Sequence, residues 1–156
     1  MKLLLGLMLV VAAFVVEDSS NAAETAWTQS ASSGSWSAAT TWVGGKVPEA
    51  SARVHVRPGH VVAYDVKSET PIRAVYVAGT LTFATDRDTR LEVGVLKVEA
   101  GDEPTEGGFD CDVHIEDLPA GAVRPALLVG TPEKPIGAKH TALIRLVAFE
   151  GQDQQS

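Results

Sequence analysis

The residues best suited to binding a charged ligand lie in one short alternating segment. Arg53, His55 and Arg57 occupy every second position, with a valine at each position between them. In a strand such residues share one face, roughly 6.5–7 Å apart, so the pattern predicts a basic ridge that His60 extends after a Pro-Gly turn. Arginine pairs with carboxylates and sulfates through parallel N–H groups. The ridge could therefore hold an acidic glycan, although a solvated outer face of a strand explains the same pattern.

Three tryptophans, Trp27, Trp36 and Trp42, lie in the N-terminal third of the chain. Exposed indole rings stack on the faces of sugars, so Trp36 and Trp42 are candidate carbohydrate contacts. The same two rings could instead cover the terminal apolar layer of a β-structure. The burial habits of large aromatic side chains favour this second interpretation.

No residue pattern predicts a catalytic centre. Glycoside hydrolysis needs two carboxylates that face each other across a cleft, and Asp65, Glu92 and Glu99 are available in strand-like segments. Their spacing does not show whether any two of them converge. The chain also has no Gly-x-Ser-x-Gly elbow and no glycine-rich phosphate loop. We therefore expect a binding protein without catalytic residues, while the enzyme alternative stays open.

Potential metal ligands are few and scattered. Asp110 to His114 is rich in acids and also contains Cys111 and a histidine, but zinc sites usually draw on two separated clusters. Asp86 and Asp88 form a weaker calcium candidate that lacks the length of an EF-hand loop. We expect no metal and no other cofactor. Because Cys111 is the only cysteine, no intramolecular disulfide can form, and we expect its side chain to be buried.

The first 22 residues have the order of a secretory signal peptide. Lys2 precedes an uncharged aliphatic run over residues 3–16, and small residues flank a cleavage position after Ala22. A membrane span needs roughly 20 apolar residues, which is more than this run supplies. We therefore expect cleavage, no membrane span in the mature chain, and secretion to the extracellular space, or to the periplasm of a bacterium.

Composition narrows the class of protein further. Hydrophobic residues make up 45% of the chain and charged residues 21%, which excludes a disordered polypeptide. The formal net charge of −7 argues against a nucleic-acid partner, because phosphate binding requires a clustered positive surface. A chain of 156 residues suits one domain with a core of its own.

From Arg53 onward, short apolar runs alternate with turn residues, and no helical periodicity is sustained. The strand-like segments are 53–57, 61–65, 74–78, 80–83, 91–98, 113–115, 126–129 and 142–149. Their recurrence about every 20 residues, with glycines at the corners, predicts an all-β fold that is a short β-solenoid of stacked, paired strands. A β-sandwich is the alternative.

The expected layout has four parts after the signal peptide: a linker over 23–34, a β domain over 35–151, a loop insertion within it over 102–125, and a polar tail over 152–156. Inside the segment 91–98 the apolar residues change parity. We expect Gly94 to mark a bend there.

An ordered string of these residues resembles the G-eight domain, named for its eight glycines. The matching residues are Trp36, Trp42 to Pro48, Val54, Val56, Gly59, Val62, Asp65, Val75, Val77, Gly79, Leu81, Phe83, Leu91, Val93, Leu96, Val98, Gly101, Leu128 to Thr131, Pro135, Ile144 and Leu146. The resemblance covers the chain from about Ser35 to Gly151. It implies an extracellular β-rich module, which in fibrocystin-like receptors and the hyaluronan-degrading cell-migration-inducing protein belongs to a much longer chain.

These observations favour a secreted, non-catalytic binding or adhesion module that recognises a glycan or a cell-surface protein. The alternatives are a small polysaccharide-active enzyme of the hyaluronan-degrading kind and an accessory fragment of a larger β-helix protein. The segment Ala142 to Phe149 is apolar on both faces, as in a strand that is covered on both sides. An open edge there would favour self-association.

Overall fold

A computed structural model describes residues 26–107, 121 and 124–152 of the chain. The expected signal peptide, the segment Asp110 to His114, the expected strand 113–115 and the end of the polar tail lie outside the described residues. The strands are β1 (Trp27–Gln29), β2 (Gly34–Ser35), β3 (Arg53–Val56), β4 (Val61–Tyr64), β5 (Ile72–Val77), β6 (Thr80–Phe83), β7 (Thr89–Val98), β8 (Ala126–Leu128) and β9 (Ala142–Leu146). Two short 3₁₀ turns, η2 (Ala39–Thr41) and η3 (Val43–Gly45), follow β2.

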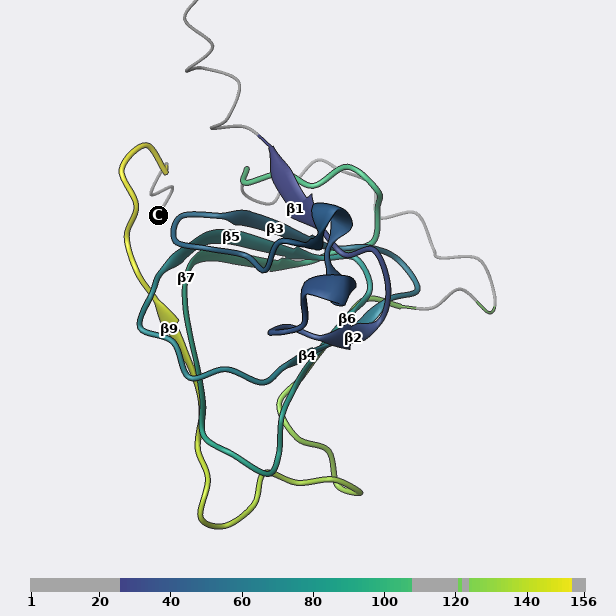
Figure 1. The fold of residues 1–156 in the computed structure, drawn as a ribbon, viewed down its shortest axis with the longest axis vertical. Helices are drawn as coiled ribbons and strands as arrows, with labels where there is room; N and C mark the ends of the chain where they lie inside the picture. Colours follow the sequence, from purple (N-terminus) through teal and green to yellow (C-terminus); the bar gives the residue numbers. More distant parts are fainter. Residues whose placement is uncertain (1–25, 108–120, 122–123, 153–156) are drawn as a thin grey trace, which may run out of the picture.

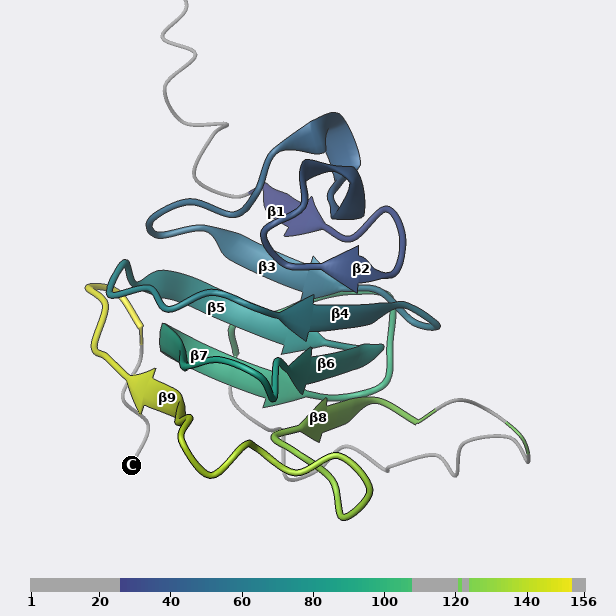
Figure 2. The same cartoon turned by 60° about the horizontal axis from the view of Figure 1, so that its bottom comes forward.

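The strands form two sheets, and within each sheet all neighbouring strands run parallel. One sheet has the order β1-β3-β5-β7-β9 and the other β2-β4-β6-β8, so successive coils of the chain add one strand to each sheet (Figure 2). Val54 lies beside Val75, and Val75 lies beside Leu96, which gives the repeat that the sequence predicts. Sandwiches are built from antiparallel strands. The β-solenoid prediction is therefore confirmed, and the sandwich alternative is wrong.

Ladders of apolar side chains fill the space inside the coils. In one sheet Val54 and Val75 are stacked and buried, and in the other Val62 and Leu81 are stacked and buried. Figure 1 views the coils nearly superposed, with the two sheets on different sides of the central space. Each such side chain contributes roughly 1.5–3 kcal/mol by leaving water. The alternating pattern of each strand thus selects the inward face.

In the longest strand, β7, the parity of the core-facing residues changes around Gly94, as the sequence indicates. Leu91 and Val93 on one side of Gly94 are fully buried, and Leu96 on the other side packs partly buried against the same core despite its opposite parity. A Cβ on residue 94 would lie 2.5 Å from the carbonyl oxygen of Arg73 in the neighbouring coil. Only glycine fits such a close approach between stacked corners.

Residues 27–29 and 34–35 belong to the sheets and not to a linker. Trp27 pairs with Arg53, and Gly34 pairs with Val62, so β1 and β2 form the first coil. These strands hold two or three residues and show no alternating apolar run. Sequence periodicity could not detect them, because backbone pairing with the next coil, and not side-chain burial, defines them.

At the other end of the stack, β9 and β8 are the last strands of their sheets among the described residues. The expectation that the segment Ala142 to Phe149 is covered on both faces is wrong. Leu143 is 42% exposed and Leu146 is 70% exposed. Beyond β9 the chain leaves the sheet, and Phe149 folds back against Gly94. The expected position of β9 at a sheet edge does agree with the structure.

Candidate functional site

The expected basic ridge lies on the outer face of the larger sheet, but it is not open to solvent. His55 is 1% exposed and packs edge-on against Tyr76, with 5.4 Å between the ring centroids. Arg53 is ion-paired with Glu106, and Arg57 alone of the three is exposed. The prediction of a solvated ridge is therefore wrong. A segment from the insertion after β7 covers this face, and strand periodicity carries no information about such a cover.

Trp36 and Trp42 form a cap on the first coil instead of a sugar platform. Each is 2% exposed, and their rings meet edge to face at 5.0 Å between centroids. The indole N–H of Trp42 donates to the carbonyl oxygen of Trp36 at 2.7 Å, and Tyr64 of the next coil packs edge-on against Trp36. Fully buried rings cannot stack on a ligand, so the capping interpretation is confirmed for both residues.

The covering segment, residues 101–107, is here called the acidic strap because it carries Asp102, Glu103 and Glu106. It runs along the outside of the larger sheet (green in Figure 1). The Glu106 carboxylate lies between two guanidinium groups. Its Oε1 is 2.5 Å from Nε of Arg53, and Nε of Arg73 is 3.1 Å from both of its oxygens. Charge-assisted hydrogen bonds of this kind are roughly twice as strong as neutral ones.

Beside this ion-paired cluster lies a cavity of about 750 Å³, within the size range of ligand sites. Its lining includes Arg53 and Arg73, together with the loop that contains Lys46, Glu49 and Ser51. Lys46, Arg53 and Arg73 bring three cations to the lining, and Glu49 and Glu150 bring two carboxylates. The cationic side of the cavity is therefore the one formed by the two arginines, which Glu106 already pairs with. The cavity is open to the surface, since the Arg53 and Arg73 side chains each keep about a fifth of their area exposed.

An aromatic side chain lies beside Arg53 in the sheet, outside the lining of the cavity. Trp27 is the register partner of Arg53 in the neighbouring strand and is half-buried. Its ring meets Tyr76 edge to face at 6.5 Å between centroids. A partly exposed indole beside one arginine combines an apolar surface with a nearby cation. Of the three tryptophans, Trp27 alone is partly exposed, whereas Trp36 and Trp42 are buried.

His55, two residues after Arg53 in β3, is a buried imidazole. Both of its ring nitrogens lack a hydrogen-bond partner within the described part of the chain. Burial lowers the pKa of His55, and the positive charges of Arg57 and His60 lower it further, while Asp102 of the strap acts in the opposite direction. Burial therefore favours the neutral form of this imidazole. It is a packing residue of the covered face and not a cationic ligand contact.

His60 makes a contact that superficially resembles a nucleophile with its base. The Ser30 hydroxyl and His60 Nδ1 are 2.8 Å apart, within the distance that activates a serine. Ser30 is, however, fully buried, and its oxygen also accepts a hydrogen bond from the backbone N–H of Arg57 at 2.9 Å. A serine enclosed in this way cannot reach a substrate. The pair instead fixes the turn after β3.

The three strand carboxylates lie in different local surroundings. Asp65 accepts hydrogen bonds from the backbone and hydroxyl of Ser37, at 3.0 and 2.6 Å. Glu92 is ion-paired with Arg90, and Glu99 lies at the end of β7 near the strap. None of the three lines the 750 Å³ cavity or the smaller cavity beside Gly94. The arrangement does not supply facing carboxylates at a cavity.

The acids considered for metal binding have other partners where the structure describes them. Asp86 is ion-paired with Arg87, and Asp88 accepts hydrogen bonds from Lys67 and from the backbone of Thr141. Over residues 26–107, 121 and 124–152, no three His, Cys, Asp or Glu side chains are grouped as a metal site requires.

Comparison with known families agrees with the architecture. The model of the G8 domain family matches residues 41–156, well over half of the chain. This chain belongs to the G8 domain family. G8 domains are typically extracellular β-rich modules. Comparisons with curated proteins and with solved structures returned no match. Within the described residues of this G8 domain, no helix is long and apolar enough to cross a membrane.

Sequence reasoning missed two members of the site, Arg73 and Glu106. A usable signal existed for the first, because Arg53 pairs with Ala74 in the next coil, which brings Arg73 next to the ridge. Applying the 20-residue repeat to the basic positions would have found it. No comparable signal existed for Glu106, since it lies in the insertion and its position depends on the path of the strap.

Proposed function

We propose that this G8 domain is an exported, non-catalytic module that binds an acidic carbohydrate at the cavity beside Arg53 and Arg73. The convergence of these two arginines, far apart in sequence, on a ligand-sized cavity is the observation that carries the proposal. Guanidinium groups recognise carboxylates and sulfates in a bidentate manner. Trp27 next to Arg53 adds an apolar surface for a sugar ring. Arg57 and His60, which follow β3 and lie outside the cavity lining, are further candidate contacts.

Export is part of the proposal and is supported from two directions. The first 22 residues have the order of a signal peptide with a cleavage position after Ala22. Membership of a family that is typically extracellular points to the same compartment. Expression with this segment, followed by N-terminal sequencing of the exported protein, tests it. A mature chain that begins at Ala23 is expected, and retention of Met1 in a membrane fraction would contradict export.

The binding proposal is tested with a panel of neutral, carboxylate-bearing and sulfated glycans. We expect binding of acidic members, reduced by Arg53→Gln and by Arg73→Gln. Arg87→Gln is the matched control, because Arg87 is an exposed arginine that pairs with its neighbour Asp86 away from the cavity. Equal losses in all three variants would indicate a nonspecific charge effect. If the domain bound a cell-surface protein and none of the glycans, its ligand would be that protein and not a carbohydrate.

An enzyme acting on polysaccharides is the competing function. The same acidic polymers, incubated with the protein and sized by chromatography, distinguish it from a binding module. We expect no shortening of the polymer. Shortened products that disappear in Glu92→Gln or Asp65→Asn would establish the enzyme instead.

We also propose that the open end of the solenoid mediates self-association. Exposed apolar side chains gather on the last strands and just after them, namely Leu128, Val129, Leu143 and Leu146. The outer edge of β9 has no strand beside it among the described residues, and an unpaired edge offers backbone donors and acceptors to another strand. The opposite end is capped by Trp36 and Trp42. Contact between two such apolar ends, related by a two-fold axis, would give a closed pair.

A further inference from the structure

The acidic strap contacts the proposed site through one side chain. Glu106 places its carboxylate between Arg53 and Arg73, which come from successive coils of the solenoid. Glu103, three residues earlier, is exposed, and neither guanidinium contacts it. The arginines therefore hold a carboxylate that the chain itself supplies from a loop.

The surroundings of the Glu106 carboxylate differ from those of an ordinary surface ion pair. Both of its oxygens are 3.1 Å from one donor, Nε of Arg73, while one oxygen also meets Nε of Arg53 at 2.5 Å. Arg73 is oriented by two further contacts: its Nη1 donates to the carbonyl oxygen of Glu150, and its guanidinium lies over the ring of Phe149 at 5.9 Å from the centroid. The arginine is thus held in position independently of the strap.

We propose that the Arg53–Arg73 pair is a binding site for the carboxylate of a uronic acid, and that Glu106 is its resting occupant. A uronate residue of a polysaccharide displaces Glu106 and places its carboxylate between the two guanidinium groups, with its ring on the side of Arg53 where Trp27 is the neighbour in register. This inference rests on the proposed function, and it adds the ligand class and the competition with the strap. The planar carboxylate of Glu106 marks the geometry that the arginines accept.

The strap lowers the affinity for such a ligand because the competition is intramolecular. A tethered carboxylate has a high effective concentration at the arginines, so an external uronate must displace it before binding. The strap also carries Asp102 and Glu103, whose charges oppose the approach of an anion. Removal of the Glu106 charge should therefore strengthen binding, whereas removal of an arginine should weaken it.

The test measures affinity for a galacturonate hexasaccharide by calorimetry, with its fully methyl-esterified form as the uncharged control ligand. We expect Glu106→Gln to bind the free acid roughly tenfold more tightly than the natural chain, and Arg53→Gln roughly tenfold more weakly. Glu103→Gln removes one strap charge outside the ion pair and should change affinity far less. Hydrogen exchange of the strap amides should increase when the hexasaccharide binds the natural chain.

The outcomes separate the inference from the proposed function. Unchanged or weaker binding by a Glu106→Gln variant that melts like the natural chain, while Arg53→Gln loses binding, overturns the competition but keeps the site. Binding of sulfated glycans without binding of the hexasaccharide overturns the uronate class alone. Tighter binding of a poly-glutamate peptide than of the hexasaccharide overturns the carbohydrate in favour of an acidic protein segment. Absence of all glycan binding, in Glu106→Gln as well, overturns both proposals.

Discussion

The two ends of this solenoid differ in whether the side chains of their last apolar layer are covered. At the N-terminal end, Trp36 and Trp42 are 2% exposed and close the first coil. At the C-terminal end, Leu143 and Leu146 are 42% and 70% exposed beside the edge of β9. Among the described residues, the coils between these two ends repeat the same ladders. The comparison shows that the repeated ladders determine the interior of the stack, whereas an end is covered only where additional residues such as Trp36 and Trp42 are present.

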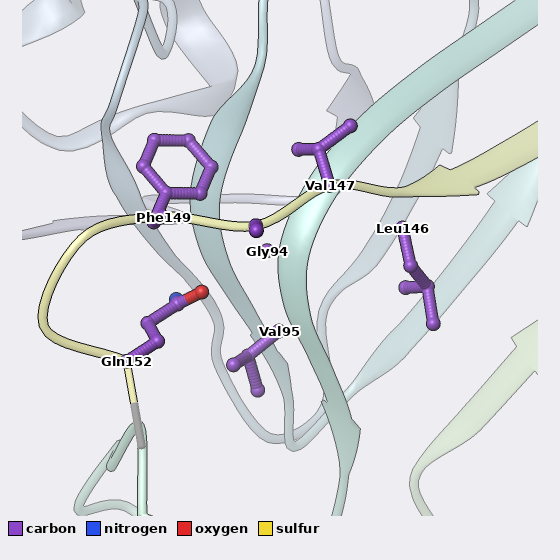
Figure 3. Close-up of a pocket in the computed structure, with 7 residues that line it drawn as sticks. Gly94, Val95, Leu146, Val147, Phe149 and Gln152 are labelled. Carbon is purple, nitrogen blue, oxygen red and sulfur yellow. The ribbon is translucent and has the colours of Figure 1, made fainter. Parts of the chain in front are cut away.

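The chain after β9 covers only a small part of the open end. Figure 3 shows Phe149 and Gln152 on one side of Gly94, with Leu146 on the other side of it. Together with Val147 these residues line a cavity of about 280 Å³. Gln152 donates from its side-chain amide to the carbonyl oxygen of Arg73 at 3.0 Å. This return of the chain supports the corner of β7, but it leaves Leu128, Leu143 and Leu146 exposed.

The largest effect is expected at the closed end. Trp42→Ala removes a fully buried ring and its hydrogen bond to Trp36, so we expect unfolding free energy to fall by about 3–5 kcal/mol. Urea denaturation followed by circular dichroism measures this loss. Trp27→Ala is the matched control, since Trp27 is only half-buried, and its loss should be clearly smaller. Equal losses would mean that the buried Trp42 contributes no more to stability than the partly exposed Trp27.

Gly94→Ala tests how the open end is held. The added methyl group would lie 2.5 Å from the Arg73 carbonyl oxygen and 2.7 Å from Phe149, so we expect a destabilisation of about 1–3 kcal/mol from overpacking. Gly44→Ala at the closed end is the control, because space is open there and only its positive φ of 76° opposes the change. Thermal melts of the two variants give the comparison. A harmless Gly94→Ala would show that the corner tolerates a side chain.

The covered face between the two ends should respond to acid through His55. Burial lowers its pKa, so the unfolded chain takes up a proton below about pH 6.5 that the folded chain resists. Stability from this residue is therefore complete above that pH and is lost as the pH falls. His55→Leu should make the decline in unfolding free energy between pH 7.5 and 5 less steep. His140→Gln leaves His55 in place and is the control; an identical slope for His55→Leu and the natural chain would refute this role.

The smallest change in stability is expected at the open end itself. Leu146→Ser alters a largely exposed side chain, so the unfolding free energy should change by no more than about 0.5 kcal/mol. Self-association at high concentration, measured by light scattering, should nevertheless decrease. Val43→Ser is the matched control, since Val43 is 55% exposed at the closed end. A protein that stays monomeric at high concentration before any substitution would contradict the association proposal.

The sequence predicted much of the fold because its inward positions obey a simple rule. Val54 and Val56 alternate with polar residues, and the repeat places each valine beside the next coil, as the structure confirms. Gly94 was identified from a change in parity alone. By contrast, β1 and β2 were missed, because strands of two or three residues that are defined by backbone pairing leave no periodic signal.

The candidate site was predictable only in part, and the outer face explains why. Arg53 and His55 were correctly placed on one face, yet whether that face meets solvent depends on where a distant loop runs. The strap brings Glu106 to Arg53 across more than fifty positions, and no local pattern encodes such a contact. Local sequence therefore determined which side chains point inward, since burial follows the strand period. Only the tertiary structure decided what covers the outward side chains, because that depends on the path of the insertion and on where the stack ends.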